Sequence, residues 1–211
     1  MWNQMLTYFR EDMNSYLEAV YKHMFISSIA LIIAILIAIP FGVISVKYKK
    51  HQQAVTNLFG ALRLIPSLAI LILFIPIFGT GLKPALVALT LLAIPPILMN
   101  TVAGLEDVPD FVIETAFSCG MTSSQVWRKI RLPSALPMIL AGIKIAAIEI
   151  IASATLAAKI GAGGLGEIIF TGLGLNRTDF LLIGGISVAI LSGTVAILFD
   201  ALEKKLIKYN N

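Results

Sequence analysis

The sequence predicts an all-α integral membrane protein with five transmembrane helices, a cytoplasmic helical hairpin and an external N-terminus. First, 58% of the 211 residues are hydrophobic and only 13% are charged. Second, the apolar residues form runs of about 20, the length that crosses a bilayer as a helix. Third, the basic residues form clusters that five crossings place on one side of the membrane. A net charge of +4 sorted in this way indicates membrane topology and not a nucleic-acid partner.

Residues 1–23 predict an amphipathic helix in the interface of the lipid membrane. Apolar residues such as Trp2 and Phe9 recur at helical spacing, with charged residues such as Arg10 between them. Tryptophan and tyrosine are typical of the headgroup level, and the simplest role of this helix is to anchor the first span. Residues 24–202 are assigned to a single transmembrane domain, and its five predicted spans are 24–46, 54–78, 82–102, 137–158 and 180–202.

Three basic clusters determine the predicted orientation. They lie after the first span, in the hairpin and at the C-terminus, and consist of Lys47, Lys49 and Lys50, of Arg128, Lys129 and Arg131, and of Lys204, Lys205 and Lys208. Lysine and arginine are enriched in cytoplasmic loops. The hairpin and the basic tail 203–211 are therefore expected in the cytoplasm, and the N-terminus outside.

Residues 114–133, ETAFSCGMTSSQVWRKIRLP, are the only long polar interval and predict a short helical hairpin. Pro109 suits the first turn of a helix, where its missing N–H costs nothing. Gly120 suits the left-handed position that ends this helix. Polar residues of this kind cannot face lipid, so the hairpin is expected to project into water.

The second arm of the hairpin has its own start and stop signals. Thr122 and Gln125 have the spacing of a capping box, which predicts a helix over residues 123–131. Pro133 follows and is expected to end this helix, because proline has no N–H for the helical ladder.

The hairpin resembles the EAA loop of binding-protein-dependent ABC importers, whose pattern is E-A-A, three residues, G, nine residues, I, one residue and L-P. The matching positions are Glu114, Ala116, Gly120, Ile130, Leu132 and Pro133, and Thr115 stands where the family usually has alanine. The resemblance implies a MetI-like permease fold, in which these residues couple the chain to a cytoplasmic ATPase. The alternative is an ordinary solvated loop between two spans.

Two further segments, RLIPSLA from Arg63 and IGAGGLG from Ile160, resemble permeases of the osmoprotectant branch of this family. The resemblance implies a permease subunit, not an enzyme, that imports glycine betaine, carnitine or choline across a bacterial cell membrane. It also implies three partners: an ABC ATPase, a second permease subunit that is related or identical, and an extracellular substrate-binding protein. ATP and Mg would be held by the ATPase, and no cofactor is expected in this chain.

Four glycines in the predicted external loop, Gly161, Gly163, Gly164 and Gly166, include a formal G-x-G-x-x-G pattern. A dinucleotide site requires a strand before the glycines and a helix after them. Here a transmembrane helix precedes them, which excludes that interpretation. The glycines are instead expected to let the loop turn back and pack near the mouth of the pathway.

Three ionisable residues within the predicted spans require an explanation, because charge in lipid is costly. Lys144 lies roughly 10 Å from the cytoplasmic start of its span and is expected to extend to the interface. Arg63 and Glu149 lie roughly 14 and 18 Å deep, near mid-membrane. We expect them to pair inside the bundle or to line a polar part of the pathway. A structural pair is favoured over contact with the substrate.

Other chemistry is not indicated by the sequence. No Walker-type G-x-x-x-x-G-K-[ST] motif occurs, so ATP hydrolysis requires another subunit. Cys119 is the single cysteine, which excludes an internal disulfide. His23 and His51 are expected at opposite interfaces, so no metal site is predicted.

Two alternatives remain open at this point. A permease of the same fold could carry another small solute, such as an amino acid or methionine. A secondary carrier or channel would explain five spans with Arg63 and Glu149, but it would leave the spacing of the EAA-like hairpin unexplained. The sequence does not rank the three osmoprotectants or distinguish an identical from a related permease partner.

Overall fold

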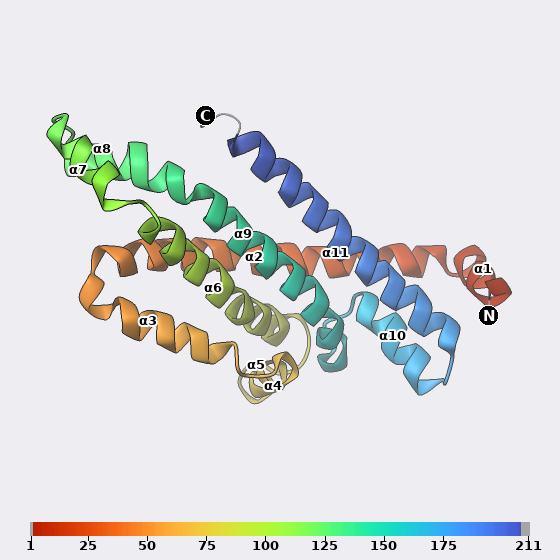
Figure 1. Cartoon of the computed structure of the whole chain (residues 1–211). Helices are drawn as coiled ribbons and strands as arrows, with labels where there is room; N and C mark the ends of the chain where they lie inside the picture. Colours follow the sequence, from red (N-terminus) through yellow and green to blue (C-terminus); the bar gives the residue numbers. More distant parts are fainter. Residues whose placement is uncertain (1, 208–211) are drawn as a thin grey trace.

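The computed structural model describes residues 2–207, and every regular element among them is a helix (Figure 1). In chain order these are α1 (Trp2–Glu11), α2 (Met13–Lys47), α3 (Lys49–Leu62), α4 (Ser67–Leu73), α5 (Ile75–Phe78), α6 (Leu82–Glu106), α7 (Asp110–Ser118), α8 (Ser123–Val126), the π-helical η1 (Trp127–Arg131), α9 (Leu132–Ala157), the 3-10 segment η2 (Ala158–Ile160), α10 (Leu165–Gly174) and α11 (Thr178–Ile207). Residues 208–211 of the predicted tail 203–211, which include Lys208, lie outside the described residues.

Four helical stretches in the described part of the chain are long and apolar enough to cross a membrane: Met13–Lys47, Leu82–Glu106, Ser123–Ile160 and Thr178–Leu206. A fifth crossing results if the bent pair Gln52–Leu62 and Ser67–Phe78 counts as one span. α6 packs against both α2 and α9, so 67% of its apolar window is buried, compared with 11% for the peripheral α11. The predicted all-helical membrane architecture is confirmed.

The N-terminal helix predicted over residues 1–23 is divided in two. α1 ends at Glu11, Asp12 adopts a non-helical ψ of 25°, and a 35-residue α2 begins at Met13. The division lets α1 fold against α11, where the Tyr8 and Phe180 rings meet edge to face at 5.1 Å. The first span is thus continuous with the second half of the segment assigned to the interface. The interfacial position of residues 1–23 stays a prediction.

The second predicted span, 54–78, is not one helix. The helix breaks over residues 63–66, and the two halves meet at an angle of 93°. Pro66 explains the break, because it lacks an N–H and its ring disfavours helical geometry at Ile65. A further short break separates α4 from α5. The backbone groups that such a break frees need protein or water partners within a membrane.

α8, η1, α9 and η2 form one continuous helical rod, Ser123–Ile160, of 38 residues. The prediction that Pro133 ends the second hairpin helix is therefore wrong, because Pro133 lies in the first turn of α9. The π-helical η1 explains the difference. The N–H of Leu132 bonds to the carbonyl of Trp127, five residues earlier, so the ladder is already widened where the proline enters.

Close packing of α6 against α9 depends on Gly142. A Cβ atom at this position would lie 2.7 Å from the Cβ of Asn100 and 2.9 Å from the carbonyl oxygen of Pro96. Small residues allow such close approach between membrane helices. Ile97 on α6 and Ile150 on α9 are buried in the same core.

Replacing Gly142 with alanine is expected to destabilise the bundle by roughly 1–3 kcal/mol, because the added methyl group overpacks a contact that includes backbone. The measurement is thermal denaturation of the purified protein in detergent, and the expected result is a lower melting temperature. Gly185→Ala is the matched control, since nothing lies within 4 Å of a Cβ at Gly185. A melting temperature for Gly142→Ala equal to that of the control would contradict the packing argument.

Candidate functional site

The first arm of the hairpin is α7, and its end has the predicted glycine geometry. Gly120 adopts a φ of 83°, in the left-handed region. The N–H of Met121 bonds to the carbonyl of Ala116 at 3.1 Å, and the N–H of Gly120 bonds to that of Phe117 at 2.9 Å. These two bonds are those of a Schellman motif, which satisfies the last carbonyls of the helix. The predicted role of Gly120 in ending the first arm is confirmed.

The second arm begins with the predicted capping box. The N–H of Thr122 donates to Oε1 of Gln125 at 2.8 Å, and the N–H of Gln125 donates to Oγ1 of Thr122 at 3.4 Å. Both hydrogen bonds of the capping box are present, so local residues determine where α8 begins. From there the rod runs without interruption into a membrane span.

Each arm of the hairpin buries one apolar side chain, and most of the hairpin is exposed. Ala116 and Val126 are 5% and 3% exposed, whereas Phe111 is 69% exposed. Of the other positions matched to the EAA loop, Glu114, Thr115 and Leu132 are exposed and Ile130 and Pro133 are half-buried. The hairpin thus presents a mixed apolar and charged surface at the end of the bundle (Figure 1).

A groove of about 330 Å³ separates the hairpin from the C-terminal end of α2. Lys47 of α2 lines one side, and Phe117 and Trp127 of the hairpin line the other. The guanidinium of Arg131 lies 5.6 Å from the centre of the Trp127 ring, within the range of a cation–π contact. Sequence reasoning missed the contribution of Trp127, because only the folded chain brings it opposite α2.

The basic clusters gather toward the hairpin end. The C-terminal ends of α2, α6 and α11 and the N-terminal end of α9 lie toward the same end of the molecule as the hairpin (Figure 1). Lys47 lies in α2, Arg128, Lys129 and Arg131 lie in η1 just before α9, and Lys204 and Lys205 lie in α11. The chain therefore alternates in direction as the predicted topology requires, while the side of the membrane that this end faces stays a prediction.

Arg63 and Glu149, which are expected to meet inside the bundle, form an ion pair. Nη2 of Arg63 lies 3.1 Å from Oε1 of Glu149. The arginine stands at the break between α3 and α4, and the glutamate is on α9, 86 residues later. Their side chains are 44% and 40% exposed, so the pair is not enclosed by this chain. Its role in the pathway stays a prediction.

Lys144 has a partner that the sequence did not indicate. Its Nζ lies 2.7 Å from Oδ1 of Asp200, so α9 and α11 are joined by an ion pair. The expected extension of Lys144 to the interface stays a prediction, and its ion pair with Asp200 was not predicted. The two residues are 56 positions apart, and no local pattern signals their meeting.

The glycine-rich loop turns between two helices, as expected for a packed loop and not for a nucleotide site. Gly161, Gly163 and Gly164 have φ values of 81°, 86° and 89°, and Gly166 lies in α10. A Cβ at Gly166 would lie 2.0 Å from the carbonyl oxygen of Thr155, so only glycine fits against α9. The position of this loop at the mouth of a pathway stays a prediction.

His23 is fully buried beneath this loop, and its expected position at a membrane interface stays a prediction. Its Nε2 lies 3.0 Å from the carbonyl oxygen of Ile151, and a Cβ at Gly164 would lie 3.1 Å from its Nδ1. The imidazole therefore joins α2 to α9 where the loop covers them. Within residues 2–207 no group of three His, Cys, Asp or Glu side chains could hold a metal ion.

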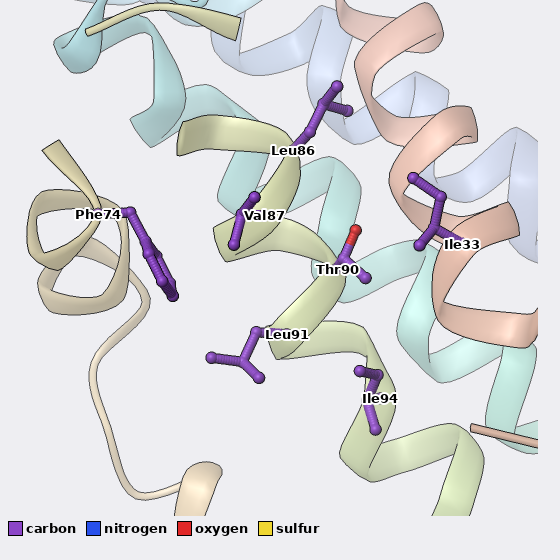
Figure 2. A pocket seen from close by; sticks show the side chains of 7 residues that line it. All are labelled: Ile33, Phe74, Leu86, Val87, Thr90, Leu91 and Ile94. Atoms are coloured by element: carbon purple, nitrogen blue, oxygen red, sulfur yellow. The ribbon is translucent and has the colours of Figure 1, made fainter. Parts of the chain in front are cut away.

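Two other cavities differ in chemistry. One of about 260 Å³ lies between α2, α6 and Phe74 at the junction of α4 and α5, and it is lined by carbon, with Thr90 as its one hydroxyl residue (Figure 2). This lining suits apolar chains and not a charged solute. Another of about 240 Å³ lies between α1 and α11, where the guanidinium of Arg177 is 4.2 Å from the centre of the Phe180 ring. Burial, with the nearby charge of Asp12, raises the pKa of Tyr8 in its wall.

Curated relatives match almost the full length of the chain. It is 40% identical over 201 residues to the carnitine transport permease protein OpuCB of Listeria monocytogenes, covering 95% of this chain and 92% of that protein. It is 38% identical over 203 residues to the glycine betaine/carnitine/choline transport system permease protein OpuCB of Bacillus subtilis, covering 96% and 94%.

Solved structures agree with the fold. The chain superposes on a subunit of the MetNI methionine ABC transporter, in an inward facing conformation, with a TM-score of 0.82 at 25% identity, covering 93% of this chain and 98% of that one. An amino acid ABC transporter crystallised with histidines gives a TM-score of 0.78 at 18% identity, covering 96% and 97%, and supports the fold alone.

The family model described as binding-protein-dependent transport system inner membrane component matches residues 30–208. Such a component is a multi-pass membrane protein that works with an ABC ATPase and a substrate-binding protein. It translocates solute and is not itself the enzyme, since ATP hydrolysis belongs to the separate ATPase subunit. The chain therefore belongs to the family of binding-protein-dependent transport system inner membrane components.

Proposed function

We propose that this chain is the permease subunit of an ATP-driven importer that carries a quaternary ammonium osmoprotectant, glycine betaine, carnitine or choline, into a bacterial cell. The cargo is supported by the relatives whose names specify carnitine, choline or glycine betaine and which match nearly the whole chain. The observation that carries the mechanism is the continuity of the hairpin with a membrane span in the rod Ser123–Ile160.

The hairpin faces the cytoplasm in this proposal, and the N-terminus lies outside. The basic residues at the hairpin end support this orientation, because lysine and arginine are retained on the cytoplasmic side. The opposite end, with α1, α10 and the glycine loop, then faces the exterior. An extracellular binding protein delivers the solute there, near Gly161, Gly163, Gly164 and Gly166.

Coupling to the ATPase proceeds through the exposed surface of the hairpin. Glu114 and Thr115 lie on the outer face of α7, while Ala116 and Gly120 hold the arms together. Ile130, Leu132 and Pro133 lie where the second arm enters α9. A rod of 38 residues is about 57 Å long, so a displacement of the hairpin is carried to the opposite end of the span. ATP and Mg are bound by the ATPase and not by this chain.

A second permease subunit, related or identical, faces the side that carries the break between α3 and α4. Leu64 there is 83% exposed, beside the half-exposed ion pair of Arg63 and Glu149. Charge on this face is disfavoured against lipid and is tolerated at a subunit interface or a hydrated path. Membrane lipid covers the remaining apolar surface, including the carbon-lined groove of Figure 2.

Another cargo, such as an amino acid, is the alternative that the structure of the methionine transporter favours. Its identity of 25% is lower than the 40% shared with a carnitine permease, so we place it second. A gradient-driven carrier would not require the exposed hairpin surface.

Uptake of labelled glycine betaine, carnitine and choline tests the proposed cargo and energy source. In cells that lack other osmoprotectant systems, we expect uptake of at least one to require this chain and ATP. Collapse of the proton gradient with ATP maintained is expected to leave that uptake intact. Uptake driven by the gradient alone would contradict the mechanism, and no uptake of the three solutes would contradict the cargo.

Gly120→Asp tests the role of the hairpin. The substitution places a side chain at a φ of 83°, where glycine is favoured, and adds charge to the docking surface. We expect the ATPase to dissociate during purification and ATP-dependent uptake to fall about tenfold, as a loss of ~1.4 kcal/mol in docking implies.

The matched control is Gly174→Asp, at the opposite end of the molecule. A Cβ at Gly174 likewise has nothing within 4 Å, but its φ is not in the left-handed region. This variant is expected to retain its ATPase and most of its uptake. Equal behaviour of the two variants would remove the special role of the hairpin.

A further inference from the structure

The ion pair of Arg63 and Glu149 lines a cavity of about 280 Å³. The cavity lies between helices α6 and α9 and the break that separates α3 from α4. Ser67 and Ser153 add hydroxyl groups to a wall that is otherwise mainly apolar. The cavity therefore presents a positive group, a negative group and two hydroxyl groups within a largely apolar part of the molecule.

The ion pair leaves most of its hydrogen-bonding capacity unused. A guanidinium has five N–H donors and a carboxylate has two acceptor oxygens. Among residues 2–207, the guanidinium of Arg63 donates one bond, from Nη2 to Oε1 of Glu149, and no protein donor reaches Oε2. The two side chains are 44% and 40% exposed, so these free groups are open to a solute. The guanidinium can donate hydrogen bonds to a solute anion, and the carboxylate can attract a solute cation by charge.

We propose that this cavity is a binding subsite for a small zwitterion, with the solute carboxylate bound by Arg63 and the quaternary ammonium group facing Glu149. This inference rests on the proposed function, because it assigns the site to the cargo of the transporter. The existing ion pair need not break. Its single contact leaves other N–H groups of Arg63 free for a carboxylate and Oε2 of Glu149 free toward a cation.

The size and polarity of the cavity suit a transient site for a small solute. It falls just below the roughly 300–1,000 Å³ of clefts that enclose drug-sized ligands. No aromatic ring lines it, so the ammonium group is held by charge alone and not in an aromatic cage. Weak binding is what a translocation pathway requires, because the solute must leave as readily as it enters.

The Lys144–Asp200 pair supplies an internal comparison. It also joins α9 to another element, at 2.7 Å, but neither residue lines the cavity. A purely structural ion pair should behave like Lys144–Asp200 when both of its charges are removed. A solute subsite should not, because its ligand loses both of its partners.

Equilibrium binding of labelled glycine betaine and choline tests the subsite. The complete transporter would be reconstituted in lipid nanodiscs without its binding protein, which removes the delivery site from the measurement. Arg63→Gln is expected to weaken glycine betaine binding by at least about tenfold, through loss of charged hydrogen bonds, and to leave choline binding within about twofold. Glu149→Gln is expected to weaken the binding of both solutes.

The double variant Arg63→Gln with Glu149→Gln separates the subsite from a structural role. If the pair is only structural, a single substitution disturbs the local packing by leaving one charge without a partner. Removing both charges eliminates that unpaired charge, so solute binding would recover. For the subsite, glycine betaine binding falls below that of either single variant, and choline binding stays as weak as in Glu149→Gln. Lys144→Gln with Asp200→Asn is the matched control, and it is expected to bind both solutes like the unchanged protein.

Three results would overturn the inference: no measurable binding by the unchanged transporter at the concentrations it transports, equal loss of betaine and choline in Arg63→Gln, or recovery in the double variant. Each of them is compatible with intact ATP-dependent uptake in cells. Failure of the proposed function would instead appear as absent uptake, so the two failures are distinguishable.

Discussion

The close contact between α6 and α9 determines where the functional parts of this molecule lie. Gly142 brings α9 against the backbone of α6 at Pro96, and α6 in turn lies against α2. Because α9 continues into the hairpin, this contact orients the proposed coupling surface. Because α9 also carries Glu149, the same contact places the carboxylate opposite Arg63. A shift of α9 against α6 would therefore move the hairpin and the ion pair together.

Prolines act differently along this chain, and the difference depends on their partners. Pro66 lies at a complete break with a bend of 93°. Pro133 instead lies in the first turn of α9, after a π-helical turn, and the helix continues through it. Pro95 and Pro96 lie within α6, which remains helical and buried between its neighbours. A proline removes one hydrogen bond in every case. Whether the helix breaks depends on the contacts that hold its two halves in line.

Two ion pairs connect α9 to the rest of the bundle, and both involve residues that would be unfavourable alone in lipid. Arg63–Glu149 ties α9 to the break after α3, and Lys144–Asp200 ties it to α11. The first is open to a cavity, while the second is only an interhelical contact. Within one helix, charge thus serves both to join elements and to present a polar surface that a charged solute could contact.

The sequence by itself determined the helical membrane class, the caps of the hairpin and the family pattern, because these depend on residues within a few positions of one another. The capping box of Thr122 and Gln125 and the left-handed Gly120 are local, and the structure has both. The sequence also identified Arg63 and Glu149 as residues that need partners, although not the cavity they share.

Tertiary structure alone decided the 93° bend in the second span, the continuous rod through Pro133, the burial of His23 and the pairing of Lys144 with Asp200. Each depends on contacts between residues far apart in the chain, whose energies no local pattern contains. A proline signals that a hydrogen bond is lost and a charge signals that a partner is needed. Only the packed neighbours determine how the bond is replaced and which partner is found.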